Sequence, residues 1–221
     1  MSDKSRKTML IFDLDGTLFK TRDAVVPAVK ETLEELGIPS VGEDKIISLL
    51  GESTSIFSEK VMEGHEDKLE DFMDIFWLRE KENVDEHGKL FDGTYEMLEK
   101  LRSSGYVLAV CSNGSQEYVD YVLHVTGISD YFDLKVSSSQ HDNKGAAVRE
   151  IIQENDHSDY IMIGDKHHDF QAGKDNNILS IGVKYGYGEP EELKQADYLV
   201  ESPEEIPDVV SRIGELVDNL N

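Results

Sequence analysis

The sequence has 221 residues, a length that fits one ordinary domain or one core domain with a small insertion, and 38% of them are hydrophobic, enough to close a sizeable core. Its 22 Lys and Arg against 46 Asp and Glu give a formal net charge of −24. Because the acidic residues are spread along the whole chain, we expect neither nucleic acid nor an anionic membrane as a partner. Most of these acids are expected to form a solvated surface.

Several features favour a cytoplasmic protein. The apolar run Met9–Phe12 is far too short to span a bilayer, and residues 1–7 lead into it without the pattern of a signal peptide. The single cysteine, Cys111, cannot form an internal disulfide and directly follows an apolar run. We therefore expect a buried thiol in a reducing compartment.

Five short apolar runs rich in β-branched residues predict strands. In chain order they are Met9–Phe12, Val107–Val110, Leu134–Val136, Tyr160–Ile163 and Leu179–Val183. Amphipathic helical patterns separate most of them, including one over 92–104 and one that begins at Lys144. Strands that alternate with helices form βαβ units, so the sequence predicts an α/β fold with a parallel sheet.

The interval from Thr21 to Gly88 interrupts this alternation, because it contains only helical patterns. Apolar residues recur at spacings of three and four over 26–36 and again over 69–77. We therefore predict a helical cap over residues 21–87 and an α/β core formed by residues 1–20 and 88–221. An insertion at this point lies above the strand ends, where it can cover a site; a helical subdomain that only packs is the alternative.

Two carboxylates, Asp13 and Asp15, directly follow the first predicted strand in the stretch Asp-Leu-Asp-Gly-Thr. Acids at a strand end are costly to desolvate unless a cation or a reaction needs them, and α/β proteins place their chemistry at the carboxyl edge of the sheet. Alternation along the extended chain turns both side chains the same way. Two acids that merely cap a loop are the structural alternative.

Polar residues also stand at two later junctions. Ser112-Asn113-Gly114 lies between a predicted strand and a helix, where a hydroxyl and backbone N–H groups form a cradle for phosphate, although a plain turn fits the same residues. Lys144 opens a predicted helix, which is an unfavourable place for a cation in the helix dipole. A bound anion would stabilise it there; an ordinary surface lysine is the alternative.

The stretch at 13–17 resembles the nucleophile motif of the haloacid dehalogenase superfamily, most of whose members are phosphatases that work through a phosphoaspartate. Ser112, Lys144 and the pair Asp165 and Asp169 stand in the order of that superfamily's later motifs. The resemblance covers nearly the whole chain and implies a Rossmann-like core with a helical cap. Within the superfamily the chain is most similar to phosphoglycolate phosphatase-like enzymes.

The resemblance implies a role for each motif residue. Asp13 would attack phosphorus, and Asp15 would protonate the leaving oxygen and later take a proton from water. Ser112, with Asn113 beside it, would bind the phosphoryl group. Lys144 would neutralise both the phosphate and the nucleophile.

The same motifs imply a Mg²⁺ site, because Mg²⁺ prefers oxygen ligands in octahedral geometry. Its ligands would be Asp13, Asp165, the backbone carbonyl of Asp15, the substrate phosphate and water, with Asp169 in an outer or water-mediated role. If Asp15 is protonated, the charges of the other three acids balance one divalent metal and Lys144. An acidic protein then presents a neutral pocket to a phosphate dianion.

The residues between the last two acids have no clear role. Lys166 stands where many relatives have a small or acidic residue. The adjacent His167 and His168 lack a third His or Cys at the spacing of zinc ligands, and we expect both to be ordinary loop residues.

These observations predict a Mg²⁺-dependent phosphomonoester hydrolase, a monomer or homodimer, that acts on a small phosphorylated metabolite such as phosphoglycolate through an aspartyl-phosphate. A phosphosugar mutase similar to β-phosphoglucomutase, a nucleotidase and a catalytically silent binding protein remain open. Retention of Asp15 disfavours dehalogenation, since a halide leaving group needs no proton. The residues expected near the site on the cap side are Phe19, Lys20, Arg22 and the segment Leu50–Phe57.

Overall fold

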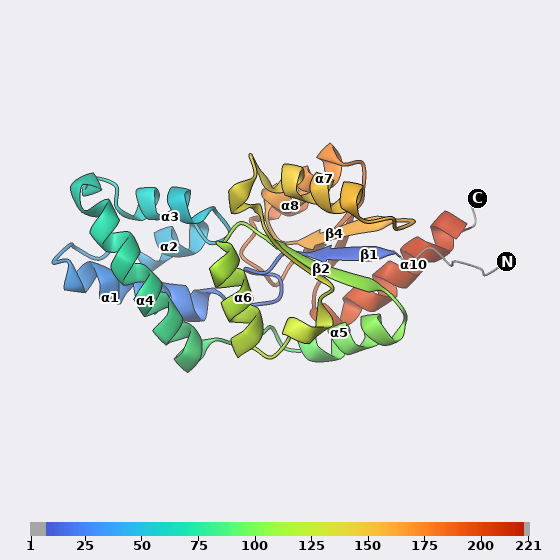
Figure 1. Ribbon diagram of the computed structural model, residues 1–221, viewed down its shortest axis with the longest axis horizontal. Helices are drawn as coiled ribbons and strands as arrows, with labels where there is room; N and C mark the ends of the chain where they lie inside the picture. Colours follow the sequence, from blue (N-terminus) through green and yellow to red (C-terminus); the bar gives the residue numbers. More distant parts are fainter. Residues whose placement is uncertain (1–7, 219–221) are drawn as a thin grey trace.

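A computed structural model describes residues 8–218, in which a parallel sheet carries helices on both faces and a helical layer at one end (Figure 1). The six strands are β1 (Met9–Phe12), β2 (Val107–Ser112), β3 (Leu134–Ser137), β4 (Tyr160–Gly164), β5 (Leu179–Val183) and β6 (Tyr198–Val200). They are parallel and follow the spatial order β3-β2-β1-β4-β5-β6. The predicted Rossmann-like α/β fold is confirmed. Its strand order reverses between β1 and β4, the place where open parallel sheets bind ligands.

All five predicted strands are present, and β6 is an addition. It is a short edge strand in which Leu199 is 46% exposed, so it lacks the continuous apolar run of a buried strand. β2 and β4 continue past the predicted ends at Val110 and Ile163. Ser112 therefore belongs to a strand, and it stands at the edge where the polar motifs meet.

Both faces of the sheet are covered. One layer consists of α5 (Thr94–Ser103), α6 (Gln116–Val125) and α10 (Ile206–Asp218), and the other of α7 (Lys144–Glu154) and α8 (His167–Asp175). Along β1, Leu10 and Phe12 pack into the first layer while Met9 and Ile11 pack into the second. This burial on both sides explains why β1 is apolar throughout. The short helix α9 (Pro190–Leu193) precedes β6.

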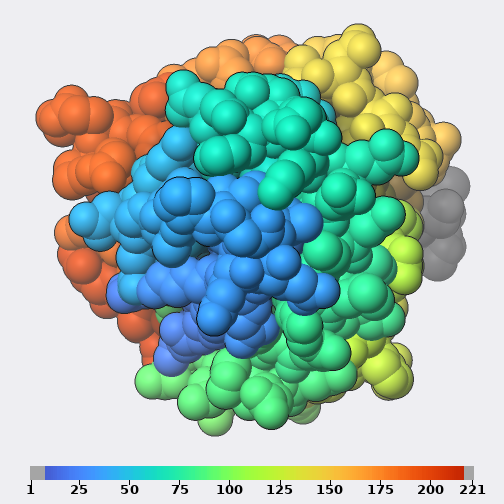
Figure 2. All heavy atoms as spheres, turned by 90° about the vertical axis from the view of Figure 1, so that its left-hand side faces the viewer, coloured from blue at the N-terminus to red at the C-terminus, as the bar shows by residue number. Residues whose placement is uncertain are grey.

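The chain between β1 and α5 forms the helical layer on the left of Figure 1. Its helices are α1 (Arg22–Glu35), α2 (Glu43–Ser48), α3 (Thr54–Val61) and α4 (Leu69–His87), and we call residues 21–87 the cap. The cap has its own buried apolar cluster, in which the rings of Phe57, Phe72 and Phe76 stack. Figure 2, viewed from that end, shows the cap in front of the core.

Three sequence predictions concern the cell compartment. Among the helices of residues 8–218, none combines the length and the hydropathy needed to span a membrane. The prediction about residues 1–7 falls outside the described residues. Cys111 is fully buried in β2, and burial raises the pKa of its thiol to about 12, which confirms the prediction of a buried structural cysteine.

Candidate active site

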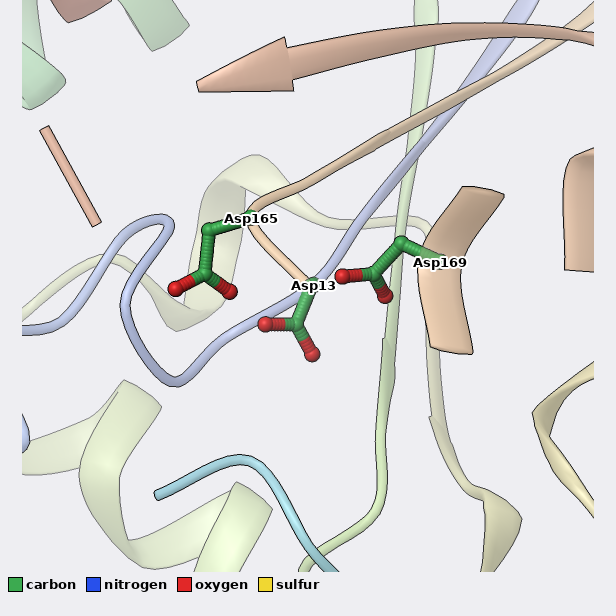
Figure 3. Close-up of side chains that lie close together, drawn as sticks. All are labelled: Asp13, Asp165 and Asp169. Atoms are coloured by element: carbon green, nitrogen blue, oxygen red, sulfur yellow. The ribbon is translucent and has the colours of Figure 1, made fainter. Parts of the chain in front are cut away.

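Three carboxylates gather where the strand order reverses (Figure 3). Asp13 directly follows β1, Asp165 directly follows β4, and Asp169 lies in the first turn of α8. One oxygen from each lies within 4.8 Å of the others, and all three side chains are buried. The parallel pairing of β1 with β4 produces this arrangement, because the backbone N–H of Asp13 bonds to the Ile163 carbonyl at 2.8 Å.

The Lys144 ammonium closes this acidic cluster on one side. It donates to Oδ1 of Asp13 at 2.6 Å and to Oδ1 of Asp169 at 2.7 Å, and its side chain is only 3% exposed. Burial lowers the pKa of Lys144, but the two carboxylates outweigh burial and raise it overall. Two acids of the chain itself, rather than only a bound anion, therefore stabilise this cation at the helix start.

The cluster has an excess of negative charge. Burial raises the pKa of Asp13 well above its usual range; Lys144 opposes this effect, and Asp169 and Asp165 add to it. Burial also raises the pKa of Asp165 to about 7, with a contribution from Asp169 and opposition from the Tyr187 N–H, which bonds to Oδ2 at 2.6 Å. Three carboxylates facing one ammonium need either protons or a further cation.

These residues fit a bound Mg²⁺. They offer only oxygen ligands, and Oδ1 of Asp165 is buried with no hydrogen-bond partner in residues 8–218. Both oxygens of Asp169 are already used, Oδ1 by Lys144 and Oδ2 by the backbone N–H of Lys166 at 3.0 Å. Asp13 accepts from Lys144 at Oδ1 and only at 3.5 Å from the Thr17 hydroxyl at Oδ2, a contact that a metal could replace. Asp13 and Asp165 are therefore the better direct ligands, with Asp169 holding Lys144 in place.

We expect Mg²⁺ to stabilise the protein more at about pH 8 than at about pH 5.5. The pKa of Asp165 in the folded protein, about 7, lies above that of an unfolded Asp. Without metal, the stability it contributes is present at low pH and is lost as the pH rises through about 7, and metal binding requires the ionised form. Thermal unfolding with MgCl₂ and with EDTA tests this. Equal Mg²⁺-induced shifts of Tm at both pH values would contradict it, and Asp165→Asn should abolish most of the shift.

Asp15 makes its hydrogen bonds outside the cluster of the other three acids. Its Oδ1 accepts from the hydroxyls of Thr21 at 2.8 Å and Tyr118 at 2.6 Å, and its Oδ2 accepts from Ser112 at 3.1 Å. Thr21 and Tyr118 are site residues that the sequence reasoning missed. The predicted use of the Asp15 backbone carbonyl as a metal ligand stays a prediction.

Ser112 and Asn113 occupy the junction between β2 and α6. The Ser112 hydroxyl is fully buried and, besides donating to Asp15, accepts the N–H of Gly114 at 3.1 Å. The Asn113 amide donates to the carbonyl of Gly51 in the cap at 2.8 Å and accepts from Ser138 at 2.6 Å. The Asn113 side chain therefore ties the cap to the core, while Ser112 is the hydroxyl beside the acids.

Glycine is required next to Asp165. Gly16 has a φ of +84°, and a Cβ at this position would lie 2.3 Å from Oδ2 of Asp165. A Cβ at Gly188 would lie 1.8 Å from the Asp165 backbone oxygen. The tight turn at Gly16 allows the loop after Asp15 to lie against the acidic cluster.

The expectation that His167 and His168 are loop residues is wrong, because both belong to the first turn of α8. The helix begins here because the Asp169 carboxylate accepts the N–H of Lys166 and so satisfies one of the free donors at the helix start. His167 pairs with Glu192 of α9 at 2.6 Å. The Lys166 ammonium reaches a cap carbonyl on α2 at 3.4 Å.

A cavity of about 250 Å³ lies beside Asp15, between the cap and the core. The cap residues that line it include Leu50, Gly51, Glu52, Thr54 and Phe57, all from the predicted segment Leu50–Phe57. Three other residues expected near the site do not line it. Phe19 is buried in the core cluster, and Lys20 and Arg22 pair with Asp92 and Glu43.

Residues 10–183 match the family model of the haloacid dehalogenase-like hydrolases, so the chain belongs to this family. It is 28% identical over 214 residues to the pyrophosphatase PpaX of Listeria monocytogenes, which covers 92% of this chain and 96% of that one. It is also 28% identical over 185 residues to the phosphoglycolate phosphatase of Aquifex aeolicus, covering 81% and 85%. The crystal structure of a predicted phosphatase from Clostridium acetobutylicum matches with a TM-score of 0.81 and 26% identity over 94% of this chain and 100% of that chain. The predicted family and enzyme class, a phosphatase, are confirmed.

Proposed function

We propose that the protein is a Mg²⁺-dependent phosphomonoester hydrolase that acts on a small phosphorylated metabolite through an aspartyl-phosphate on Asp13. One observation carries this proposal: the Asp13 carboxylate is buried at the reversal of strand order, with the Lys144 ammonium 2.6 Å away and two further acids around it. A buried cluster of this kind is unfavourable for folding alone, and such clusters are typical of catalytic sites.

In the first half of the reaction, an oxygen of Asp13 attacks phosphorus and the bond from phosphorus to the leaving oxygen breaks. Asp15 gives a proton to that oxygen, so that the leaving group departs as an alcohol. Lys144 and the Ser112 hydroxyl offset negative charge on the phosphoryl oxygens. Thr21 and Tyr118 orient the Asp15 carboxyl through the hydrogen bonds at 2.8 Å and 2.6 Å.

In the second half, water attacks the phosphorus of the aspartyl-phosphate while Asp15 takes a proton from it. Inorganic phosphate leaves and the Asp13 carboxylate is restored. Asp13 and Asp165 would hold Mg²⁺, which when bound supplies positive charge for the phosphoryl group.

The cap has a separate part in the proposed reaction. In this proposal, residues 21–87 cover a core made of residues 1–20 and 88–221, and the cavity beside Asp15 receives the leaving group. The Asn113 amide, 2.8 Å from the Gly51 carbonyl, holds the cap loop against the core. A covered site keeps bulk water away from the reacting phosphoryl group.

The purified protein should release inorganic phosphate from p-nitrophenyl phosphate, or from a panel of phosphorylated metabolites, when Mg²⁺ is present. EDTA should abolish the release, and added Mg²⁺ should restore it. Conversion of a hexose 1-phosphate to the 6-phosphate without free phosphate would instead indicate a mutase. A broad panel without turnover at several pH values and metals would favour a binding protein.

A further inference from the structure

The cavity beside Asp15 is lined by acidic, apolar and hydroxyl-bearing side chains. Its acids are Asp15, Glu52, Glu80 and Glu117, and no lysine, arginine or histidine of residues 8–218 lines it. Glu52 is within ion-pair distance of Lys60 outside the cavity, and Glu117 is exposed. Glu80 differs from both, because it lies in the interior of the cap–core interface.

Glu80 lies on α4 and is only 9% exposed. In the part of the chain that the structure describes, its carboxyl group has neither a hydrogen-bond nor an ion-pair partner. Burial raises its pKa to about 8, and the nearby Asp15 carboxylate adds to the effect. Buried polar groups are nearly always hydrogen-bonded, so a carboxyl group in this state needs a partner from outside the chain.

A second unpartnered group lines the same cavity. The Ser58 hydroxyl on α3 is completely buried and has no hydrogen-bond partner among the described residues. The remaining cap wall is largely apolar and includes Phe57, Phe76 and Trp77. The Ser58 oxygen is too deeply buried to reach a ligand, so the Glu80 carboxyl group, without a partner beside this apolar wall, is the group that can bind a small polar ligand group.

We infer that the substrate's leaving group carries no negative charge and donates a hydrogen bond to Glu80. This inference rests on the proposed hydrolase function and narrows its substrate class. A carboxylate or a second phosphate in the cavity would be an ion held against a largely apolar wall with no cation among the lining residues to pair with it, and burying an unpaired charge is costly. A hydroxyl or ammonium group instead supplies the missing donor.

The inferred uncharged leaving group differs from the leaving groups of the substrates in the relatives' names. Phosphoglycolate carries a carboxylate, and pyrophosphate carries a second phosphate where an ester has its alcohol. Neither suits a cavity lined by Glu80 and Asp15 without a basic side chain among the described residues. Phosphoglycolate, one of the substrates expected from the sequence, is therefore disfavoured.

Pairs of esters that differ only in one group test the inference. One pair is 2-hydroxyethyl phosphate and phosphoglycolate, and another is glycerol 3-phosphate and 3-phosphoglycerate; in each, a hydroxymethyl group replaces a carboxylate. We expect kcat/KM for phosphate release to be at least roughly tenfold higher for the hydroxyl member. The kcat/KM for 2-aminoethyl phosphate, compared with that for 2-hydroxyethyl phosphate, shows whether an ammonium group is preferred to a hydroxyl group. A preference for either over the carboxylate supports the inference.

Glu80→Gln keeps the side-chain shape and removes the acid, so it should reduce the preference for the hydroxyl member by roughly tenfold. Glu70→Gln is the matched control, since Glu70 is an exposed residue on the same helix and should keep the wild-type ratio. Thermal unfolding confirms that both variants fold.

The outcomes are distinguishable. If the carboxylate member of a pair is hydrolysed as well as or better than its partner, the inference is wrong while the hydrolase proposal stands. Phosphate release only from esters outside these pairs is judged by the best of those substrates. If the leaving group of that substrate carries a negative charge, the inference is wrong. If p-nitrophenyl phosphate and the whole panel give no phosphate with Mg²⁺, the hydrolase proposal itself fails, and the inference fails with it.

Discussion

Asp13→Asn should lower the rate of phosphate release by at least roughly three orders of magnitude. The amide has nearly the same shape as the carboxylate but cannot attack phosphorus to form the covalent intermediate. Folding should be largely retained, because Lys144 keeps its contact with Asp169 at 2.7 Å and because burial already disfavours the charge on Asp13. The measurement is kcat with p-nitrophenyl phosphate together with thermal unfolding of the same preparation.

The covalent intermediate can also be detected directly, by the mass of the phosphorylated peptide. Mass spectrometry of the wild-type protein, quenched in acid during turnover, should find one phosphoryl group on the peptide that contains Asp13. Asp13→Asn should lack it, and the exposed cap residue Asp74 provides a control in Asp74→Asn, which should be phosphorylated normally. Activity above about one tenth of wild type in Asp13→Asn would rule out the covalent route.

The acidic cluster could be predicted because each member is placed by a recognisable element. β1 and β4 are buried on both faces and are nearly apolar throughout, so their ends are marked in the sequence. Asp13 and Asp165 follow those ends directly. Parallel strands bring such positions to one edge of the sheet, and the fold then determines that the two carboxylates are neighbours.

The hydrogen-bond partners of Asp15 and the lining of the cavity could not be predicted in the same way. Tyr118 stands in the apolar stripe of α6, so the sequence pattern predicts a core residue and does not indicate a hydrogen bond from its hydroxyl. Glu80 lies in α4 among many charged residues and resembles a surface position. Tertiary packing between the cap and the core buries it, and periodicity within one helix carries no information about those contacts.

Short or exposed elements also could not be predicted from the pattern of hydrophobic residues. β6 has three residues and pairs with a single neighbour, β5, so its sequence is not required to be apolar on both faces. The start of α8 at His167 depends on the hydrogen bond that the backbone N–H of Lys166 donates to the Asp169 carboxylate. Such capping contacts shift a helix boundary by a few residues without changing the fold.

Lys144→Met should destabilise the protein and inactivate it. The side chain is 3% exposed, and its removal leaves the carboxylates of Asp13 and Asp169 buried without their cation. Removing one partner of a buried ion pair typically lowers the free energy of unfolding by about 3–5 kcal/mol. Phosphate release should fall at least roughly a hundredfold, because the phosphoryl oxygens lose a positive charge.

The pH dependence and a double variant separate the two effects. Lys144 lowers the pKa of Asp13 and of Asp165, so both pKa values rise further without it. The destabilisation should therefore be smallest at low pH, where these two acids are protonated, and should grow as the pH rises. Denaturant unfolding in EDTA at about pH 5.5 and about pH 8 measures this. Adding Asp169→Asn to Lys144→Met removes one of the unpaired charges and should recover part of the stability, but not the activity. If Lys144→Met instead unfolds like wild type at both pH values, the cation does not stabilise the cluster, and its contacts at 2.6 Å and 2.7 Å have no energetic weight.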